Sequence, residues 1–203
     1  VLIGSVVAGV YIYLGTMANI GQDRQTPTVS RAQINAIVEQ AYTYRQKGEY
    51  ALAIARLNTL PEGDERNKLL AETYMEQGNL NFIQDPPQIE SAIDAYSNAV
   101  RYDADEPEYG YSLGMAYLDL GRQKKEDPET SDHYLALSRQ SFQAVLDRHP
   151  DHVGSLDGLS KVAVLQRDNV TAANAWRHII EVAPDSYEAE RARNNLKSLN
   201  YKF

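Results

Sequence analysis

Apolar residues recur at three- and four-residue spacing from residue 30 onward, and the sequence has no run of alternating β-branched residues. This periodicity predicts amphipathic helices, so we expect an all-α fold. Ser30 and Gln33 form a capping-box pattern at the first helix start. Asp85 and Asp127 each precede a proline, as expected of an acidic N-cap before the first helical residue, and a further start is marked at 185–188.

The first 22 residues are a separate apolar block without any charged side chain. As a helix, residues 1–21 would be about 31 Å long, close to the ~30 Å hydrocarbon core of a bilayer. The pattern therefore predicts one transmembrane anchor helix over 1–21. A signal peptide cleaved near Ala18 and a buried core helix are the alternatives. Four small residues spaced by four would let a neighbouring transmembrane helix approach closely: Gly4, Ser5, Ala8 and Gly9.

The segment 22–29 is polar, contains Pro27 and lacks periodicity, which predicts a short linker between the anchor and a domain over 30–203. The charges beside the anchor are too few for the positive-inside rule to fix its orientation. N-terminal anchors followed by one soluble domain often export that domain. We therefore expect the domain on the outer face of the membrane (periplasmic, lumenal or extracellular) and not in the cytoplasm.

The sequence also repeats itself. Three segments carry a small residue, an aromatic one three positions later, and a glycine after four more: Ala41, Tyr44, Gly48; Ala71, Tyr74, Gly78; Gly114, Tyr117, Gly121. We expect each glycine to let the chain turn between two antiparallel helices. Four further segments place a large residue four positions after a small one: Ala53 and Leu57, Ala92 and Tyr96, Ser138 and Phe142, Ala172 and Trp176. Two prolines that close such segments, Pro150 and Pro184, are 34 residues apart.

These residues resemble the tetratricopeptide repeat (TPR) family, whose unit is a helix-turn-helix of 34 residues. The resemblance implies a superhelix of about four helical hairpins, at 34–63, 64–106, 107–152 and 153–186, closed by a capping helix at 187–199. The second and third units are too long, with insertions at 79–88 and 122–134 in the turns between their helices. Lengthened helices with slack turns and a partner-contact surface are both open interpretations of these insertions. The fourth unit has Ala163 and Arg167 where the others have tyrosine and glycine.

The composition of the chain excludes several classes of function. The formal net charge of −8 and the pI near 5.0 argue against binding to nucleic acid, because the chain repels polyphosphate. The absence of cysteine excludes disulfides and thiolate chemistry through this chain. We find no catalytic sequence motif, and we expect no enzyme, cofactor, metal or small-molecule substrate. The acidic and histidine residues near 103–108 and 147–152 are interpreted as turn residues and not as metal ligands.

The resemblance implies that the first helix of each unit lines a groove. The family's pattern assigns these residues to it: Val38, Tyr42, Arg45, Gln46, Lys68, Glu72, Met75, Glu76, Tyr111, Met115, Leu118, Asp119, Asp157, Lys161, Val164 and Leu165. Val38 and Tyr42 stand where the chaperone-docking branch of the family begins its clamp of lysine and asparagine, so we do not expect that branch. We expect Tyr44, Tyr74 and Tyr117 to pack between helices, whereas Tyr42 and Tyr111 suit either packing or the groove.

A groove of tyrosine, methionine and aliphatic side chains among carboxylates suits a partner segment with apolar anchors and some positive charge. Together with the anchor, it predicts a membrane-bound adaptor for protein–protein interaction, as a subunit or assembly factor of a membrane complex. The alternative is a maturation chaperone that holds its clients transiently, as in cytochrome c, photosystem or pilus biogenesis.

Overall fold

A computed structural model describes residues 29–199, and all the secondary structure in that range is helical. The helices are α2 (Arg31–Gln46), α3 (Tyr50–Leu57), α4 (Asp64–Ile83), α5 (Ile89–Tyr102), α6 (Pro107–Gln123), α7 (Pro128–Leu146), α8 (Val153–Leu165), α9 (Asn169–Val182) and α10 (Tyr187–Ser198). The predicted all-α fold is confirmed for this part of the chain. The predicted anchor at 1–21, its contact residues Gly4, Ser5, Ala8 and Gly9, and nearly all of the linker lie outside the described residues.

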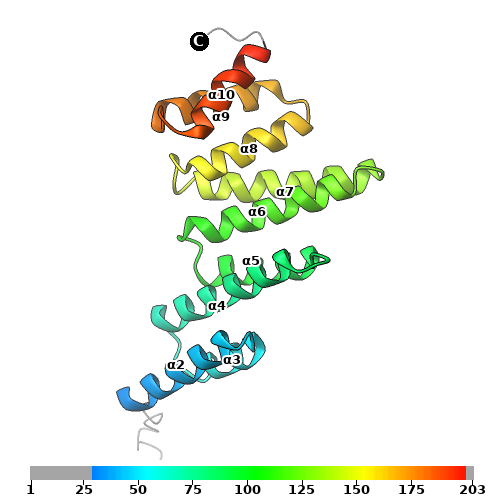
Figure 1. Ribbon diagram of the computed structural model, residues 1–203. Coiled ribbons are helices and arrows are strands. Elements are labelled where there is room, and N and C mark those ends of the chain that lie inside the picture. Colours follow the sequence, from blue (N-terminus) through cyan, green and yellow to red (C-terminus); the bar gives the residue numbers. More distant parts are fainter. Residues whose placement is uncertain (1–28, 200–203) are drawn as a thin grey trace, which may run out of the picture.

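The helices pack as antiparallel hairpins in an elongated stack (Figure 1). The pairs are α2 with α3, α4 with α5, α6 with α7, and α8 with α9, and α10 packs on α9 at the end of the stack. The turns inside the hairpins lie along one edge of the stack, at the right of the view, and the links between hairpins lie along the other. The first helices of successive hairpins therefore follow one another along the stack, which brings their side chains onto a common face.

Most predicted helix starts carry the expected caps. Ser30 and Gln33 exchange hydrogen bonds in a complete capping box, and the Asp127 carboxylate accepts from the Thr130 amide with Pro128 as the first helical residue. The cap predicted at Asp85 is wrong, because α5 begins at Ile89. An acidic residue before proline occurs in turns as well as at helix starts, so that signal is not specific.

Small residues let the two helices of a hairpin approach, and a large side chain fills the space beside them. Phe142 of α7 is fully buried against Gly114 of α6 and Gly158 of α8, where an added Cβ would lie 2.6 Å and 2.3 Å from its ring. The Ser138 hydroxyl donates to the carbonyl of Gly114 at 2.7 Å, so a polar small residue adds a bond across the same contact. The predicted pair of Ser138 and Phe142 therefore forms the centre of the third hairpin.

Two of the three predicted turn glycines have a different role. Gly48 ends the first helix with a φ of 74°, in the left-handed region that favours glycine. Gly78 and Gly121 are instead buried inside α4 and α6, which continue to Ile83 and Gln123. An added Cβ would lie 2.5 Å from Tyr96 at Gly78 and 3.1 Å from Leu135 at Gly121. These glycines allow close helix packing, and the chain turns several residues later.

The same extension accounts for much of the two insertions. Residues 79–83 continue α4, and residues 128–134 form the first turns of α7, so the segments outside helices are 84–88 and 124–127. The extended hairpin of α6 and α7 projects beyond its neighbours along the edge of intra-hairpin turns (Figure 1). The extra residues therefore lengthen helices more than they lengthen turns.

The buried side chains form three clusters along the stack. One joins the first hairpin to the second, a second joins the second hairpin to α6, and the largest joins the third and fourth hairpins to α10. The last helix contributes Ala189, Ala192 and Leu196 to this cluster. Its remaining residues are mostly polar, so α10 covers the apolar end of the fourth hairpin with a face that water can solvate.

Arg167 replaces the turn glycine of the fourth hairpin while keeping a left-handed backbone, with a φ of 59°. A residue with a side chain is strained there, so we expect Arg167→Gly to raise the free energy of unfolding by about 0.5–1 kcal/mol after the entropy cost of glycine. Urea denaturation measures this change. Gln166→Gly is the control, since its φ of −82° suits any residue and its substitution should lower stability. An equal loss in both variants would contradict the strain.

Candidate binding groove

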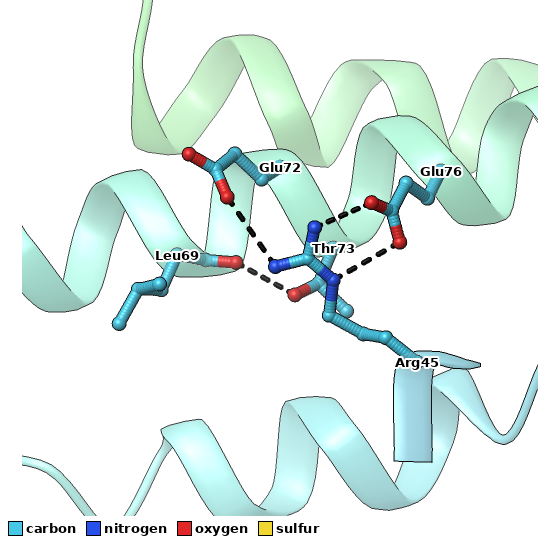
Figure 2. A network of polar contacts seen from close by, with 5 residues as sticks. All are labelled: Arg45, Leu69, Glu72, Thr73 and Glu76. Carbon is cyan, nitrogen blue, oxygen red and sulfur yellow. Dashed lines mark hydrogen bonds and ion pairs between the residues drawn. The ribbon is translucent and has the colours of Figure 1, made fainter. Parts of the chain in front are cut away.

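Three predicted groove residues meet between the first and second hairpins. Arg45, near the end of α2, binds two carboxylates of α4 (Figure 2). Its Nε donates to Glu76 Oε2 at 3.0 Å and its Nη1 donates to Glu72 Oε2 at 3.3 Å, while Nη2 donates to the second oxygen of Glu76. Because Glu72 and Glu76 are four residues apart, both project from the same side of α4. The guanidinium therefore connects two hairpins across the predicted groove.

This cluster has more negative than positive charge. The bond to Glu76, together with the charges of Glu76 and Glu72, raises the pKa of Arg45 despite its partial burial, so the guanidinium stays protonated. One cation serves two carboxylates, and each carboxylate remains about half exposed. The cluster thus presents a net negative charge to solvent at the start of the stack.

This cluster also has two tyrosines beside it, Tyr109 and Tyr50, which were not predicted to line the groove. Burial, with added repulsion from Glu72, Glu106 and Asp103, raises the pKa of Tyr109 to about 12. Burial, followed by the charge of Glu76, also raises the pKa of Tyr50. Tyr50 begins α3, a second helix that the family's pattern leaves out of the groove, and Tyr109 lies in the first turn of α6, ahead of the pattern's first position. No pattern in the sequence indicates that either residue lies beside the groove.

The opposite end of the stack holds a second ion cluster. Lys161 Nζ lies 2.8 Å from Asp157 Oδ2 on α8, and Arg191 of α10 donates to Asp157 Oδ1. Burial lowers the pKa of Arg191, but the bond to Asp157 and the charges of Asp157, Tyr187 and Glu188 more than offset this, so the pKa is raised. Here two cations share one carboxylate, which is the reverse of the balance around Arg45.

Tyr111 connects the groove to the core beneath it. Its ring packs against Phe142 and His152, with centroid distances of 6.1 Å and 5.7 Å. Burial raises the pKa of Tyr111, with further repulsion from Asp157, Glu108 and Glu188 and an opposing effect of Arg191. Tyr111 therefore packs in the core, which was one of its two predicted roles, and its hydroxyl also experiences the charge of Asp157 in the second ion cluster.

A hollow of about 350 Å³ adjoins the second ion cluster, between α8, α9 and α10. Four predicted groove residues line it: Asp157, Lys161, Val164 and Leu165. α10 adds Arg191, Asn195 and Ser198, which were not predicted because the resemblance implies only a capping role for that helix. Trp176 of α9 and Leu199 complete the apolar part of the wall, and Arg122 of α6 also lines the hollow.

The other predicted groove residues differ widely in exposure. Tyr42 is 57% exposed and Lys68 is exposed as well, whereas Val38, Met75 and Met115 are partly buried against the cores of their own hairpins. Gln46 is exposed, and Asp119 pairs with Arg122 one turn along α6 at 3.6 Å. The assignment of Leu118 to the groove is wrong. Its side chain is 0% exposed in the largest core cluster, which joins the third and fourth hairpins, so it cannot line an open groove.

The remaining sequence candidates have structural contacts. Tyr44 packs on the first core, and Tyr74 and Tyr117 stack on Tyr102 and Tyr134 at 5.8 Å and 6.3 Å. The histidines of the turn before α8 bond across hairpins, with His149 Nε2 2.7 Å from the Asp105 carbonyl and His152 Nε2 3.3 Å from Glu108. Within residues 29–199, no cluster of histidine and carboxylate side chains is arranged to hold a metal ion.

Replacing Arg45 with methionine should lower the free energy of unfolding by about 1–2 kcal/mol, because its three charge-assisted hydrogen bonds are lost and two carboxylates on one face are left without their cation. The loss is kept small by the exposure of both glutamates. Thermal denaturation of Arg45→Met in the native background and in a Glu72→Gln, Glu76→Gln background measures it. The cost should shrink in the second background, and equal costs would mean that the ion cluster contributes no stability.

No helix in the described part of the chain combines the length and the apolar character needed to cross a membrane. The predicted span at 1–21 is outside that part, so this finding concerns the hairpins and α10 alone.

Comparison with known proteins identifies the fold. No protein-family model matches the sequence, and no curated protein is similar to it in sequence. The TPR domain of OM64 from Arabidopsis superposes with a TM-score of 0.54 at 17% identity, over 65% of this chain and 98% of that one. The first TPR of Spaghetti (RPAP3), bound to the HSP90 peptide SRMEEVD, gives 0.54 at 16% identity, over 66% and 92%. The second TPR domain of human RPAP3, in complex with the HSP70 peptide SGPTIEEVD, gives 0.51 at 12%, over 66% and 98%. At these identities the likeness concerns architecture: the chain has the fold of a tetratricopeptide repeat domain.

Proposed function

We propose that the protein is a membrane-anchored scaffold that binds segments of partner proteins along the face formed by α2, α4, α6 and α8, which we call the groove face. The observation that carries this proposal is the presence of exposed apolar side chains on the helices that hold the two ion clusters. Tyr42, Val164 and Leu165 are exposed on first helices, although each would be more stable buried. Side chains of this kind beside fixed charges suit recognition of another polypeptide.

The similar solved structures support peptide binding by this architecture. Two of the TPR domains named above were determined with peptides of HSP90 and HSP70. We do not extend those ligands to this chain, because Val38 and Tyr42 occupy the positions at which the chaperone clamp begins. The groove face near Arg45 instead suits a segment with apolar anchors and some positive charge, since its cluster has two carboxylates for one cation.

The anchor gives this scaffold its place in the cell. A helix over 1–21 and a linker of about eight residues would keep the groove face within a few tens of ångströms of the bilayer. We propose that the domain lies on the outer face of the membrane and serves a membrane complex as a subunit or assembly factor. Partner segments would then reach the groove face from proteins held in the same membrane.

The experiment is purification of the tagged protein from membranes solubilised in a mild detergent. We expect the protein to remain in the membrane fraction after alkaline extraction and to carry one set of membrane proteins at a fixed molar ratio. A variant without residues 1–21 should leave the membrane fraction. Recovery of the native protein from the soluble fraction, or alone from detergent, would contradict the proposal. Partners present below one molar equivalent would instead favour the transient chaperone.

A further inference from the structure

The hollow between α8, α9 and α10 is lined by charged, amide and apolar side chains. Its chemistry can therefore be specified in more detail than that of the whole groove face proposed above. Its volume of about 350 Å³ is at the lower end for ligand sites, and it suits one or two side chains of a bound segment. Asp157, Lys161, Val164 and Leu165 of α8 line it, so it continues the groove face at its C-terminal end. A segment lying along the groove face would therefore reach it.

The charges of this hollow are arranged so that an approaching ligand meets cations. Asp157 is recessed, with 13% of its side chain exposed, and its two oxygens are taken by Lys161 and Arg191. Those two side chains remain 32% and 34% exposed, and Arg122, which pairs with Asp119, also lines the hollow. An ammonium has three donors and a guanidinium has five, so both cations keep donors for a second acceptor. The neighbouring carboxylates Asp119 and Glu188 do not line the hollow.

The apolar part of the wall complements these cations. Val164 and Leu165 are exposed on the last turn of α8, and Leu199 and Trp176 lie beside them in the wall. An aliphatic side chain placed here would cover apolar surface that water now contacts. Asn169 and Asn195 add amide groups to the lining, which can bond to the backbone of a bound segment.

From this arrangement we propose that the hollow binds an acidic segment of a partner protein, with a carboxylate on Lys161 and Arg191 and a neighbouring aliphatic side chain on Val164 and Leu165. The assignment rests on the proposed function and specifies the chemistry at one end of the groove face. It also implies a direction, since the cluster around Arg45 at the other end has the opposite charge balance. A bound segment would place its acidic part at α8 and α10 and its basic part at α2 and α4.

The test uses Trp176, the one tryptophan of the sequence, as a fluorescent reporter within the hollow. The probe is the nonapeptide Ser-Gly-Asp-Glu-Leu-Glu-Leu-Gly-Ser, acetylated and amidated so that it has no terminal charges. Its matched control replaces each acid by its amide. We expect the acidic peptide to shift the emission saturably, with an affinity about tenfold above that of the amide peptide and weaker at high salt.

Variants locate the binding. Lys161→Gln and Arg191→Gln should each weaken binding of the acidic peptide about tenfold. Lys47→Gln, a control at an exposed cation after α2 that is not assigned to the groove, should leave the affinity unchanged. Circular dichroism checks that each variant is folded, and Lys161→Gln leaves the contact of Arg191 with Asp157 in place. Equal affinity for both peptides, or equal loss in all three variants, would overturn the assignment. Glutarate binding as tightly as the peptide would also overturn it, by indicating a small-anion site. If partners still bind near Tyr42, only this assignment fails and the scaffold function stands.

Discussion

Phe142→Ala is expected to lower the free energy of unfolding by about 3–5 kcal/mol, the largest effect of any substitution considered. The ring is fully buried between Gly114 and Gly158, and it joins the third hairpin to the fourth. Truncation would remove its contacts with both helices and leave a cavity that neither glycine can fill. Urea denaturation followed by circular dichroism at 222 nm measures the loss. A cost near 1 kcal/mol would show that the two hairpins do not depend on this ring.

The same contact can be tested from the glycine side. Gly158→Ala should lower stability by about 1–3 kcal/mol although alanine favours a helix, because its Cβ would lie 2.3 Å from the Phe142 ring. Phe142→Leu shortens the side chain and makes room for that methyl group. We therefore expect the double variant to be more stable than the sum of the two single losses implies. Strict additivity would contradict direct contact as the cause.

Alkaline solution should destabilise the second hairpin through Tyr96. Its ring packs on Gly78, and its hydroxyl donates to Asn79 Oδ1 at 2.9 Å. Burial raises the pKa of Tyr96 to about 12, above the value near 10 of an unfolded chain. Because Tyr96 is an acid whose pKa is higher in the folded protein, its neutral form adds to the free energy of unfolding. This contribution is complete below pH 10 and is lost as the pH rises through 12. The expected loss is about 2 kcal/mol.

Tyr96→Phe separates this titration from that of other groups. Near pH 8 the variant should be less stable than the native protein by about 0.5–1.5 kcal/mol, because the bond to Asn79 is lost. Phenylalanine does not ionise, so the difference should vanish or reverse as the pH approaches 12. Denaturant unfolding across this pH range measures both curves. Parallel curves would mean that Tyr96 ionises as easily in the folded protein as in the unfolded chain.

The packing of the hairpins could be predicted where small and large residues recur in register. The small residue Ser138 and the large residue Phe142 are four positions apart in the sequence, and both lie in one helix contact in the structure. The role of Gly78 could not be predicted, because a glycine near the end of a helical pattern indicates a turn and a close packing contact equally well. Only the position of Tyr96, on the following helix, distinguishes the two.

The candidate site was predictable to a similar degree. Glu72 and Glu76 share a helix face by their spacing alone, but their common bond to Arg45 depends on how α2 packs on α4. Leu118 has a groove position in the family's pattern, yet its side chain is fully buried among the residues that join the last two hairpins. Arg191 could not be predicted because a capping helix has no groove positions in that pattern, although one face of α10 completes the hollow.

Site-specific photocrosslinking tests the central claim, that the groove face binds a partner protein. A benzophenone amino acid replaces Tyr42 or Val164 on the groove face, and Leu52 or Val170 on second helices as exposed apolar controls. The protein is irradiated in intact cells and its adducts are identified by mass spectrometry. We predict that Tyr42 and Val164 give adducts with the same partner and that Leu52 and Val170 do not. Adducts of that partner from the second helices alone would contradict the claim.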